Sequence, residues 1–555
     1  MRAIEIDNLS FKYENRLAPA LDRVNLNVSD GEFLLLAGAS GSGKSTLLKC
    51  INGLIPHRYL GGYSGEVRIK DKPVAASQLL EISLIIGTVL QEAEKQLVSS
   101  SVQDDVAFGP CNLALPRAEI ERRIEHSLGS MGISPLRERS IFALSGGQKQ
   151  RLAIAGVLAM EPQIILFDEP LANLDSNGIR LMLEVFGELR ERGKTIIVAE
   201  HRTEEVIRAN PSRVVVVDKG RIVADDSDPE VLVDFADVLK TPAEYALKNR
   251  LRAGKRSFKI ESLVAQKLRS SPTGAEIVAS SGIVLIRVED VSFEYSGGVR
   301  ALDHVNFVIH EGERIALLGN NGAGKSTLAL NLGGLLRPTE GRVLVQGADT
   351  SFMSVSEIAT NVAIVFQNPF SMLFAKTVQD ELSFGPKNIG VQPAAISRLI
   401  PHVAKQCTVD HLLNKSPFAS SFGEKKRICV GSVLTMQPKC VILDEPTSGQ
   451  DYRSYSEFMG FIRSLSEQGH TLILITHDTD LAVEYTDRTI IMNNGRVVAD
   501  GATKTILADP KMLEENAIRE TSLLEISRKI THGETVLSLA DLLNALPDAH
   551  TAELR

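Results

Sequence analysis

The sequence predicts an α/β fold that occurs twice in the chain, each time around a mainly parallel core sheet. A glycine-rich loop stands twice between an apolar run and the expected start of a helix. Continuous apolar runs at residues 164–167 and 472–475 are typical of parallel strands that are buried on both faces. The same separation joins three pairs of like residues: Gln91 and Gln367, Glu169 and Glu445, and His201 and His477. One fold has therefore been duplicated.

The length of 555 residues alone suggests roughly three or four domains, but the repeat favours two large ones. We expect a first domain at residues 1–240, a linker at 241–282, a second domain at 283–520 and a C-terminal tail at 521–555. The linker contains a cluster of turn-forming small residues at 270–274. After about Gly501 we expect peripheral helices, to which no chemistry is assigned.

The composition excludes several classes of protein. A net charge of −8 gives no support to a bulk attraction for nucleic acid or anionic lipid. The five cysteines lack metal-binding or CxxC spacing, as expected of buried thiols in a reducing compartment. No stretch approaches the roughly 18 apolar residues that span a bilayer, and the N-terminus alternates like a strand instead of a signal peptide. We expect a cytoplasmic protein that only a partner could hold at a membrane.

The first glycine-rich loop follows the apolar residues 33–37 and precedes a helix expected at about 46–54. It fits the GxxxxGK[ST] spacing, in which backbone N–H groups surround a phosphate chain at a helix N-terminus. Lys44 would reach the β- and γ-phosphates, and the Ser45 hydroxyl would bind Mg²⁺. The loop consists of Gly38, Ala39, Ser40, Gly41, Ser42, Gly43, Lys44, Ser45 and Thr46.

A second loop with the same spacing follows the apolar residues 315–318. A lone glycine-rich turn can match this pattern by chance, but a second copy in the same context argues against chance. The sequence therefore predicts two sites for a nucleoside triphosphate. The second loop consists of Gly319, Asn320, Asn321, Gly322, Ala323, Gly324, Lys325, Ser326 and Thr327.

An aromatic pair precedes each loop, ending in Tyr13 in the first half and in Tyr295 in the second. Each tyrosine ring could stack on an adenine base or simply pack in the core, and both roles stay open. After each loop an apolar strand ends in a glutamine, Gln91 or Gln367. Matching glutamines in the two halves indicate a sensor for Mg²⁺ and water.

Leu144 opens the sequence LSGGQKQR. Ser145 can cap the helix that follows, and Gly146 and Gly147 leave backbone N–H groups uncovered before Gln148. We interpret these residues as a second tip that binds an anion.

Paired acids then follow the buried strand of each half: Asp168 with Glu169, and Asp444 with Glu445. The aspartate would hold Mg²⁺ through water, while the glutamate would act as general base on the attacking water. The next apolar strand ends at His201 in the first half and at His477 in the second. A histidine at such a position, taken alone, is more often structural than catalytic.

Taken in this order, the phosphate loop, Gln, LSGGQ, Asp-Glu and His resemble the ATP-binding subunits of ABC transporters over nearly the whole chain. The resemblance implies tandem P-loop NTPase domains, each with a mainly parallel core sheet, a helical subdomain and a small antiparallel β subdomain. It also implies a head-to-tail pair of domains, in which the LSGGQ tip of one closes over the ATP held by the other. ATP and Mg²⁺ are the expected cofactors.

The resemblance also implies the role of each candidate residue. The catalytic set is Gln91, Glu169, His201, Gln367, Glu445 and His477. The Mg²⁺ set is Ser45, Asp168, Gln91, Ser326, Asp444 and Gln367. ATP would contact both phosphate loops together with Tyr13, Tyr295, Ser145, Gly146, Gly147 and Gln148.

The segments VQDDVAFGP, at residues 102–110, and VQDELSFGP, at residues 378–386, resemble the energy-coupling-factor (ECF) importers more narrowly. This resemblance implies an energising ATPase for uptake of a vitamin or metal ion. Its expected partners are a membrane-embedded T-type coupling subunit and a substrate-capture subunit, with the chain peripheral on the cytoplasmic face of the cell membrane. No nucleic acid partner is expected.

The second half departs from the pattern at the tip, where Ser420, Ser421, Phe422, Gly423 and Glu424 stand at the LSGGQ position. Phe422 puts a bulky ring where bare backbone would approach a γ-phosphate. In the head-to-tail pair this altered tip would cover the ATP at Lys44. We therefore predict that the site of Lys325 and Glu445 carries most turnover, although the first site retains Glu169 and His201.

Two other functions share the duplication. A soluble twin-ATPase translation factor is disfavoured because the linker has no long charged run and because one tip is altered. A fused sugar-importer ATPase is disfavoured by the two ECF-like segments. The transported substrate is not encoded in a chain that never touches it.

Overall fold

The computed structural model describes residues 2–14, 16–91, 95–171, 174, 176–253, 282–448, 450, 452–531 and 542. These residues form two compact units, one mainly of residues up to Ala246 and the other mainly of residues from Leu247 onward. Helix α9, Ala243–Ala253, lies in the segment predicted as a linker, whose cluster at residues 270–274 lies outside the described residues. The predicted domain bounds stay a prediction.

The first unit is built on a six-stranded sheet with the order β10-β9-β3-β8-β7-β6. All neighbours are parallel except β10, which runs antiparallel to β9 at one edge. This is the mainly parallel core sheet predicted from the apolar runs. The strands are β3 Phe33–Ala37, β6 Ile86–Val89, β7 Ile164–Asp168, β8 Thr195–Glu200, β9 Arg213–Asp218 and β10 Arg221–Asp226.

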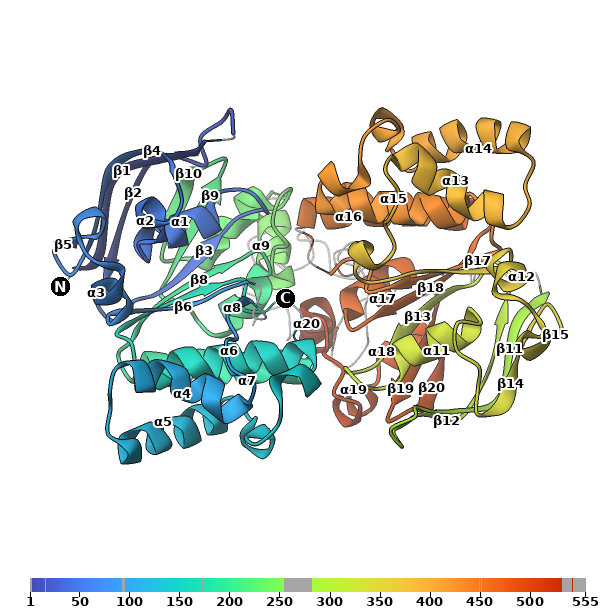
Figure 1. Ribbon diagram of the computed structural model, residues 1–555, viewed down its shortest axis with the longest axis horizontal. Helices are drawn as coiled ribbons and strands as arrows, with labels where there is room; N and C mark the ends of the chain where they lie inside the picture. The colour runs from blue at the N-terminus through green and yellow to red at the C-terminus, as the bar shows by residue number, and fades with distance from the viewer. Residues whose placement is uncertain are drawn as a thin grey trace, which may run out of the picture. The chain divides into compact units, whose positions relative to one another are not determined.

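Strand β3 shows why its sequence is apolar throughout. Phe33 and Leu35 pack into the core that faces α6 and α7. Leu34 and Leu36 pack into the core that faces α1 and the antiparallel sheet. Because successive side chains of a strand point to opposite faces, both faces of the sheet are covered. Figure 1 shows α6 and α7 on one side of this sheet and α1 with β1, β2 and β4 on the other.

A second, antiparallel sheet of the first unit has the order β2-β1-β4-β5. Its strands are β1 Arg2–Tyr13, β2 Leu21–Ser29, β4 Gly61–Ile69 and β5 Lys72–Pro73. Helices α4, α5 and α6 pack on one another and form the helical subdomain. The helices are α1 Lys44–Ile51, α2 Leu54–His57, α3 Leu79–Ser83, α4 Val102–Asn112, α5 Arg117–Ser130, α6 Gly146–Ala159, α7 Ser176–Glu191 and α8 Thr203–Arg208.

The helix after the first phosphate loop is shorter than predicted. The sequence suggested one helix to about residue 54, but α1 ends at Ile51. Gly53 has a φ of 79°, a left-handed conformation that interrupts the helix. A side chain there would also meet Ile82, because a Cβ atom would lie 2.6 Å from its Cδ1. A glycine at this position thus ends one helix and starts the next.

The second unit repeats both sheets. The mainly parallel sheet has the order β16-β17-β18-β13-β19-β20, and the antiparallel sheet has the order β12-β11-β14-β15. The core strands are β13 Arg314–Leu318, β16 Val362–Val365, β17 Cys440–Asp444, β18 Thr471–Thr476, β19 Arg488–Asn493 and β20 Arg496–Ala502. The others are β11 Val284–Glu294, β12 Arg300–His310, β14 Glu340–Val345 and β15 Ala348–Asp349.

Helices α13, α14 and α15 are the counterparts of α4, α5 and α6, and α13 and α14 both pack on α15. The helices of the second unit up to its last core strand are α11 Lys325–Leu332, α12 Val355–Ala359, α13 Val378–Asn388, α14 Pro393–Gln406, α15 Phe422–Leu434, α16 Tyr452–Glu467 and α17 Thr479–Tyr485. Among the described residues, no helix is both long and apolar enough to cross a bilayer.

The C-terminal helices are less peripheral than the sequence suggested. They are α18 Thr503–Leu507, α19 Pro510–Glu515 and α20 Ser522–Thr531. Leu507, Leu513 and Leu524 are buried in a separate core cluster with Leu318 of β13 and Ile491 of β19. This segment therefore covers the face of β13 and β19 that is opposite to the face on which α11 packs.

Candidate nucleotide-binding sites

Each phosphate loop connects a buried strand to a helix, β3 to α1 in the first unit and β13 to α11 in the second. Gly43 and Gly324, which precede the two lysines, have φ of 114° and 99°. A Cβ atom would lie 2.7 Å from the Ala20 carbonyl at Gly43 and 2.4 Å from the Ala301 carbonyl at Gly324. The tight turn and the close approach of backbone both require glycine at this position.

The lysine of each loop is folded back onto its own backbone. Lys44 Nζ donates to the carbonyls of Gly38 at 2.6 Å and Ala39 at 2.8 Å. Lys325 Nζ donates in the same way to Gly319 at 2.6 Å and Asn320 at 2.9 Å. Both ammonium groups are therefore held at the loop where a phosphate chain would lie.

The second loop has an additional anchor. Asn320 Nδ2 donates to the backbone carbonyl of Asn516 at 3.1 Å, and Asn516 Oδ1 accepts from Asn493 Nδ2 at 3.0 Å. Asn516 caps helix α19 in the segment to which the sequence analysis assigned no chemistry. The corresponding residue of the first loop is Ala39, which has no side-chain donor.

A hydroxyl and a carboxylate meet beside each loop. Ser45 Oγ donates to Asp168 Oδ1 at 2.8 Å, and Ser326 Oγ donates to Asp444 Oδ2 at 2.9 Å. Burial raises the pKa of Asp168 to about 6 and also raises the pKa of Asp444, against the opposing effect of the serine hydrogen bonds. Oxygen ligands of this kind fit Mg²⁺, whose charge would favour the ionised carboxylate.

Glu169 and Glu445 lie directly after these aspartates in a left-handed backbone conformation, with φ of 48° and 45°. Such a conformation costs a residue other than glycine about 1–2 kcal/mol. The backbone N–H of Glu169 donates to the carbonyl of Ala199, and that of Glu445 to Ile475, both at 2.9 Å. Strain of this kind persists only where surrounding contacts hold it, and it is typical of functional sites.

The carboxylate of Glu169 faces Gln91 and His201. Gln91 Nε2 donates to Glu169 Oε2 at 2.6 Å. His201 Nδ1 lies 3.5 Å from Glu169 Oε1 and 3.2 Å from Glu200 Oε1. Burial acts to lower the pKa of His201, but the two acids outweigh it and the pKa is raised.

The second site pairs its residues differently. His477 Nδ1 lies 2.8 Å from Glu445 Oε1, within hydrogen-bond distance. Gln367 Nε2 contacts the Ser448 hydroxyl at 3.5 Å. The first site thus brings both Gln91 and His201 to its candidate base, whereas in the second site His477 meets the base and Gln367 contacts Ser448 instead.

Glu200 is a buried acid that the sequence analysis left without a role. Its side chain is fully buried, and its Oε1 accepts from the backbone N–H groups of His201 at 2.9 Å and Arg202 at 3.1 Å. The matching residue of the second unit is Thr476, whose hydroxyl accepts from the Asp478 N–H at 3.0 Å. The signal in the sequence was an acid at the end of an otherwise apolar strand.

Tyr13 and Tyr295 are each tied to the phosphate loop of their own unit. Their hydroxyls lie 3.3 Å from Thr46 Oγ1 and 3.1 Å from Thr327 Oγ1. Their rings pack edge-on against Phe11 and Phe293, with centroids 4.8 and 4.9 Å apart. The Tyr295 residue is 42% exposed, which leaves ring surface for a base to stack on.

The LSGGQ tip forms the N-terminus of α6, as predicted. Ser145 Oγ accepts from the Gln148 N–H at 3.3 Å, and Gln148 Oε1 accepts from the Ser145 N–H at 3.0 Å. This reciprocal capping box satisfies two donors of the first turn. Gly146 and Gly147 are the first residues of the helix, and a Cβ added at Gly146 would meet no atom within 4 Å.

The altered tip of the second unit keeps the cap but not the bare backbone. Ser421 Oγ accepts from the Glu424 N–H at 3.3 Å, and Glu424 Oε2 accepts from the Ser421 N–H at 2.7 Å. The exchange of Gln for Glu is therefore compatible with the capping box. Phe422 occupies the position of Gly146 and remains 39% exposed.

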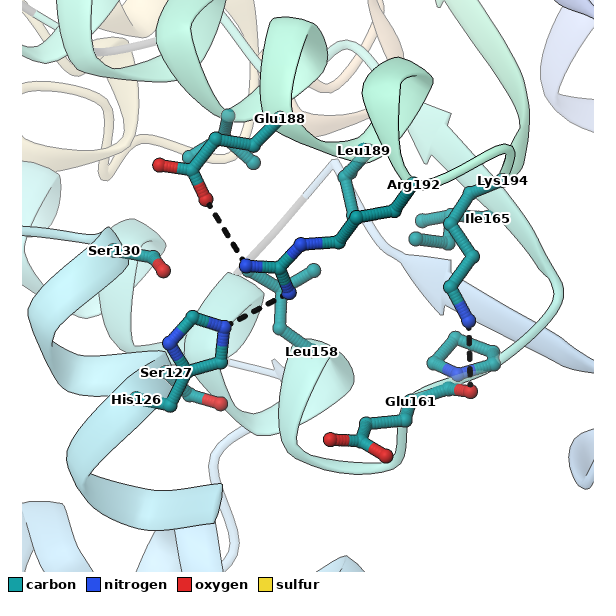
Figure 2. A pocket seen from close by; sticks show the side chains of 12 residues that line it. His126, Ser127, Ser130, Leu158, Glu161, Ile165, Glu188, Leu189, Arg192 and Lys194 are labelled. Atoms are coloured by element: carbon teal, nitrogen blue, oxygen red, sulfur yellow. Dashed lines mark hydrogen bonds and ion pairs between the residues drawn. The ribbon is translucent and has the colours of Figure 1, made fainter. Parts of the chain in front are cut away.

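A pocket in the first unit lies away from these residues. Figure 2 shows Arg192 directed at His126 and Lys194 directed at the backbone of Glu161, at 2.8 and 3.3 Å. Its lining residues Lys194 and Ile165 stand just before β8 and near the start of β7. Because Asp168 and Glu200 stand at the opposite ends of those strands, the pocket is separate from the nucleotide site.

The fold and the two sites define a protein with tandem P-loop domains that bind and hydrolyse a nucleoside triphosphate. The model of the ABC transporter family matches residues 21–172 and 302–448. The chain therefore belongs to the ABC transporter family, as an ATP-hydrolysing, ATP-binding protein with two fused nucleotide-binding domains. The fold and the activity predicted from the sequence are confirmed.

Two relatives match over almost their full length, and both are named as ABC transporter ATP-binding proteins. One, from Caldanaerobacter subterraneus, is 37% identical and is covered to 98%, as is this chain. The other, from Enterococcus faecalis, is 34% identical, with 95% of each chain covered.

A solved structure, cbiO1 from Clostridium perfringens, is described as part of the ABC transporter complex cbiONQ. It is 35% identical and has a TM-score of 0.39, covering 42% of this chain and 95% of its own.

Proposed function

We propose that this chain is the ATP-hydrolysing energy-coupling subunit of an ECF-type importer that takes up a vitamin or metal ion. Separate membrane subunits, a T-type coupling subunit and a substrate-capture subunit, would form the path for the substrate. The chain would then lie peripherally on the cytoplasmic face of the cell membrane. The proposal rests on the two ECF-like segments and on the surface they create.

These segments form α4 and α13 and fix the loop that follows each candidate sensor glutamine. Asp105 Oδ1 accepts from the backbone N–H groups of Val98 at 2.8 Å and Ser99 at 3.0 Å. Glu381 Oε2 accepts from those of Phe374 at 3.0 Å and Ala375 at 2.8 Å. An acid at the same place in each repeat thus joins the helix to the glutamine loop.

The same two helices expose aromatic rings. Phe108 of α4 is 51% exposed and its counterpart Phe384 of α13 is 48% exposed. Phe384 packs edge-on against the exposed Phe374, with ring centroids 4.6 Å apart. The Phe374–Phe384 pair is an exposed apolar cluster of the kind that marks interaction sites, and Phe108 stands at the matching position of the first unit. A partner seated here would act on the glutamine loop, and this surface is the observation that carries the proposal.

ATP hydrolysis would drive the importer through a head-to-tail pair of the two units, with one ATP and one Mg²⁺ at each phosphate loop. Lys44, Ser45, Asp168 and Glu169 would serve the first site, and Lys325, Ser326, Asp444 and Glu445 the second. Hydrolysis would separate this head-to-tail pair, because the γ-phosphate would no longer join the two units.

The test is to purify the full chain from its host membrane in mild detergent and to identify the membrane proteins retained with it. We expect two different membrane proteins with wild type. Phe108→Ser with Phe384→Ser should lose them and keep ATPase activity, whereas Phe352→Ser, at a 91% exposed ring, should retain them. Sedimentation with ribosomes, or membrane partners of another importer class, would contradict the proposal.

A further inference from the structure

Lys426 lies on α15 at the position that Gln150 occupies on α6. Its Nζ donates to three backbone carbonyls, those of Glu445 at 3.2 Å, Pro446 at 2.7 Å and Ser448 at 3.0 Å. Among the described residues, Gln150 Nε2 reaches one such carbonyl, that of Pro170 at 2.5 Å. The second unit thus ties the loop after its candidate base at three points.

An ammonium group matches these acceptors in number. Lysine carries three N–H donors, and here three carbonyls converge on them. Lys426 is 3% exposed, and burial lowers its pKa to about 8, against the attraction of Glu445. Because a buried charge is costly unless it is well bonded, the convergence of carbonyls accounts for a lysine at this position.

Lys426 acts on the backbone of the residue that faces the histidine. Glu445 is held in its left-handed conformation by its N–H bond to Ile475 on one side and by its carbonyl bond to Lys426 on the other. Both bonds fix the direction in which the carboxylate leaves the backbone. The carboxylate in turn meets His477.

The altered tip is part of the same arrangement. Phe422 and Lys426 are four residues apart on α15, so that their side chains lie on one face of the helix. The ammonium of Lys426 lies 5.2 Å from the centre of the Phe422 ring. The residues that replace Gly146 and Gln150 of α6, namely Phe422 and Lys426, are therefore in contact.

We propose that Lys426 is a positioning residue that holds Glu445 in its hydrolytic geometry, and that the Phe422 ring covers its ammonium and links the altered tip to this loop. The inference rests on the proposed role of Glu445 as the general base of the second site. It accounts for a bulky ring at the tip as one half of a pair.

The test uses the full chain with Glu169→Gln, so that turnover reports the second site. In this background we compare Lys426→Met, Lys426→Gln and a matched control, Lys439→Met, which removes an exposed lysine paired with Glu311. Lys426→Met should lower kcat by roughly tenfold to a hundredfold with little change in the KM for ATP. The kcat of Lys426→Gln should lie between that of Lys426→Met and that of the Glu169→Gln parent. The control Lys439→Met should leave kcat unchanged.

Thermal unfolding and binding of a fluorescent ATP analogue show whether each variant is folded. If Lys426→Met does not fold, Lys426→Gln decides, because the same residue serves α6. Wild-type kcat in a folded Lys426→Gln variant, or a loss in KM alone, would overturn the proposal. Full turnover in the double variant Glu169→Gln with Glu445→Gln would instead refute the proposed role of Glu445. Thermal unfolding of the Lys426 variants would then decide whether Lys426 anchors the loop.

Discussion

At the scale of single residues, the two sites share their parts but not their pairing. Each has a phosphate-loop lysine, a serine–aspartate pair and a glutamate with left-handed backbone. Glu169 is bonded to Gln91, whereas Glu445 is within bonding distance of His477. His201 lies 3.5 Å from Glu169, against 2.8 Å between His477 and Glu445, so the second base has the closer histidine and the arrangement better suited to activating water.

We therefore expect the two glutamates to contribute unequally. Glu445→Gln should reduce ATPase turnover by about a hundredfold or more, as loss of a general base does, while Glu169→Gln should cost far less. Steady-state phosphate release measures both, and binding of the fluorescent ATP analogue controls for loss of nucleotide. If Glu169→Gln abolished turnover and Glu445→Gln left it intact, the assignment of the two sites would be reversed.

The pH dependence of the second site should report Lys426. Its pKa in the folded chain is about 8, below the 10.5 of a free lysine. The amine is therefore protonated well below pH 8 and loses its proton as the pH rises through that value. The groups facing it are Glu445 and Cys429, and burial raises the pKa of Cys429 to about 12. In the Glu169→Gln background, kcat should fall above about pH 8, and Lys426→Gln should lack this fall.

At the scale of elements, α6 and α15 begin with the same capping box but present different tips. Both serine caps and both glutamine or glutamate partners are in place. Two residues of the first turn differ, but the Gln-to-Glu exchange keeps the cap, so the exposed tip differs at the residue that is a bare glycine in α6 and an exposed phenylalanine in α15. The two halves therefore share the capped helix but not the exposed backbone that could bind an anion.

Replacing the ring should change the first site. In a Glu445→Gln background, Phe422→Gly should raise turnover several-fold, because the altered tip would then offer bare backbone to the ATP at Lys44. Single-turnover hydrolysis gives the rate, and Phe418→Gly, at an exposed ring before the tip, is the control. An unchanged or lower rate in a folded Phe422→Gly variant would argue against the ring as the cause of the asymmetry.

At the scale of the whole molecule, two units of one fold have diverged around their active loops. The second unit anchors its phosphate loop to the C-terminal segment through Asn320 and Asn516 and its base loop through Lys426. The first unit has Ala39 and Gln150 at these positions. The additional anchors fall on the unit whose glutamate we propose as the main base.

If the units close over ATP, the chain should become more compact when nucleotide is bound and not hydrolysed. The double variant Glu169→Gln with Glu445→Gln should show a smaller radius of gyration by small-angle X-ray scattering when ATP and Mg²⁺ are added. Adding Lys44→Ala and Lys325→Ala should remove the response, because the phosphates lose their cation. If ATP binds to the double variant but the radius of gyration does not change, the proposal that the two units close over ATP is wrong.

The sequence by itself determined the duplicated α/β fold, both phosphate loops and the capped tip. Each depends on a short stretch of chain, in which glycine spacing, a helix cap or a buried strand is encoded by neighbouring residues. The break at Gly53 was missed, although glycine is the residue that most readily adopts the left-handed conformation found there.

Only the tertiary structure decided which side chains meet. Three features depend on distances between segments far apart in sequence: which of the Gln and His side chains reach each glutamate, the three carbonyls bonded to Lys426, and the bond from Asn320 to Asn516. Side-chain contacts of this kind follow from how helices and strands pack, which no local pattern encodes. Two halves with nearly the same motifs therefore carry different sites.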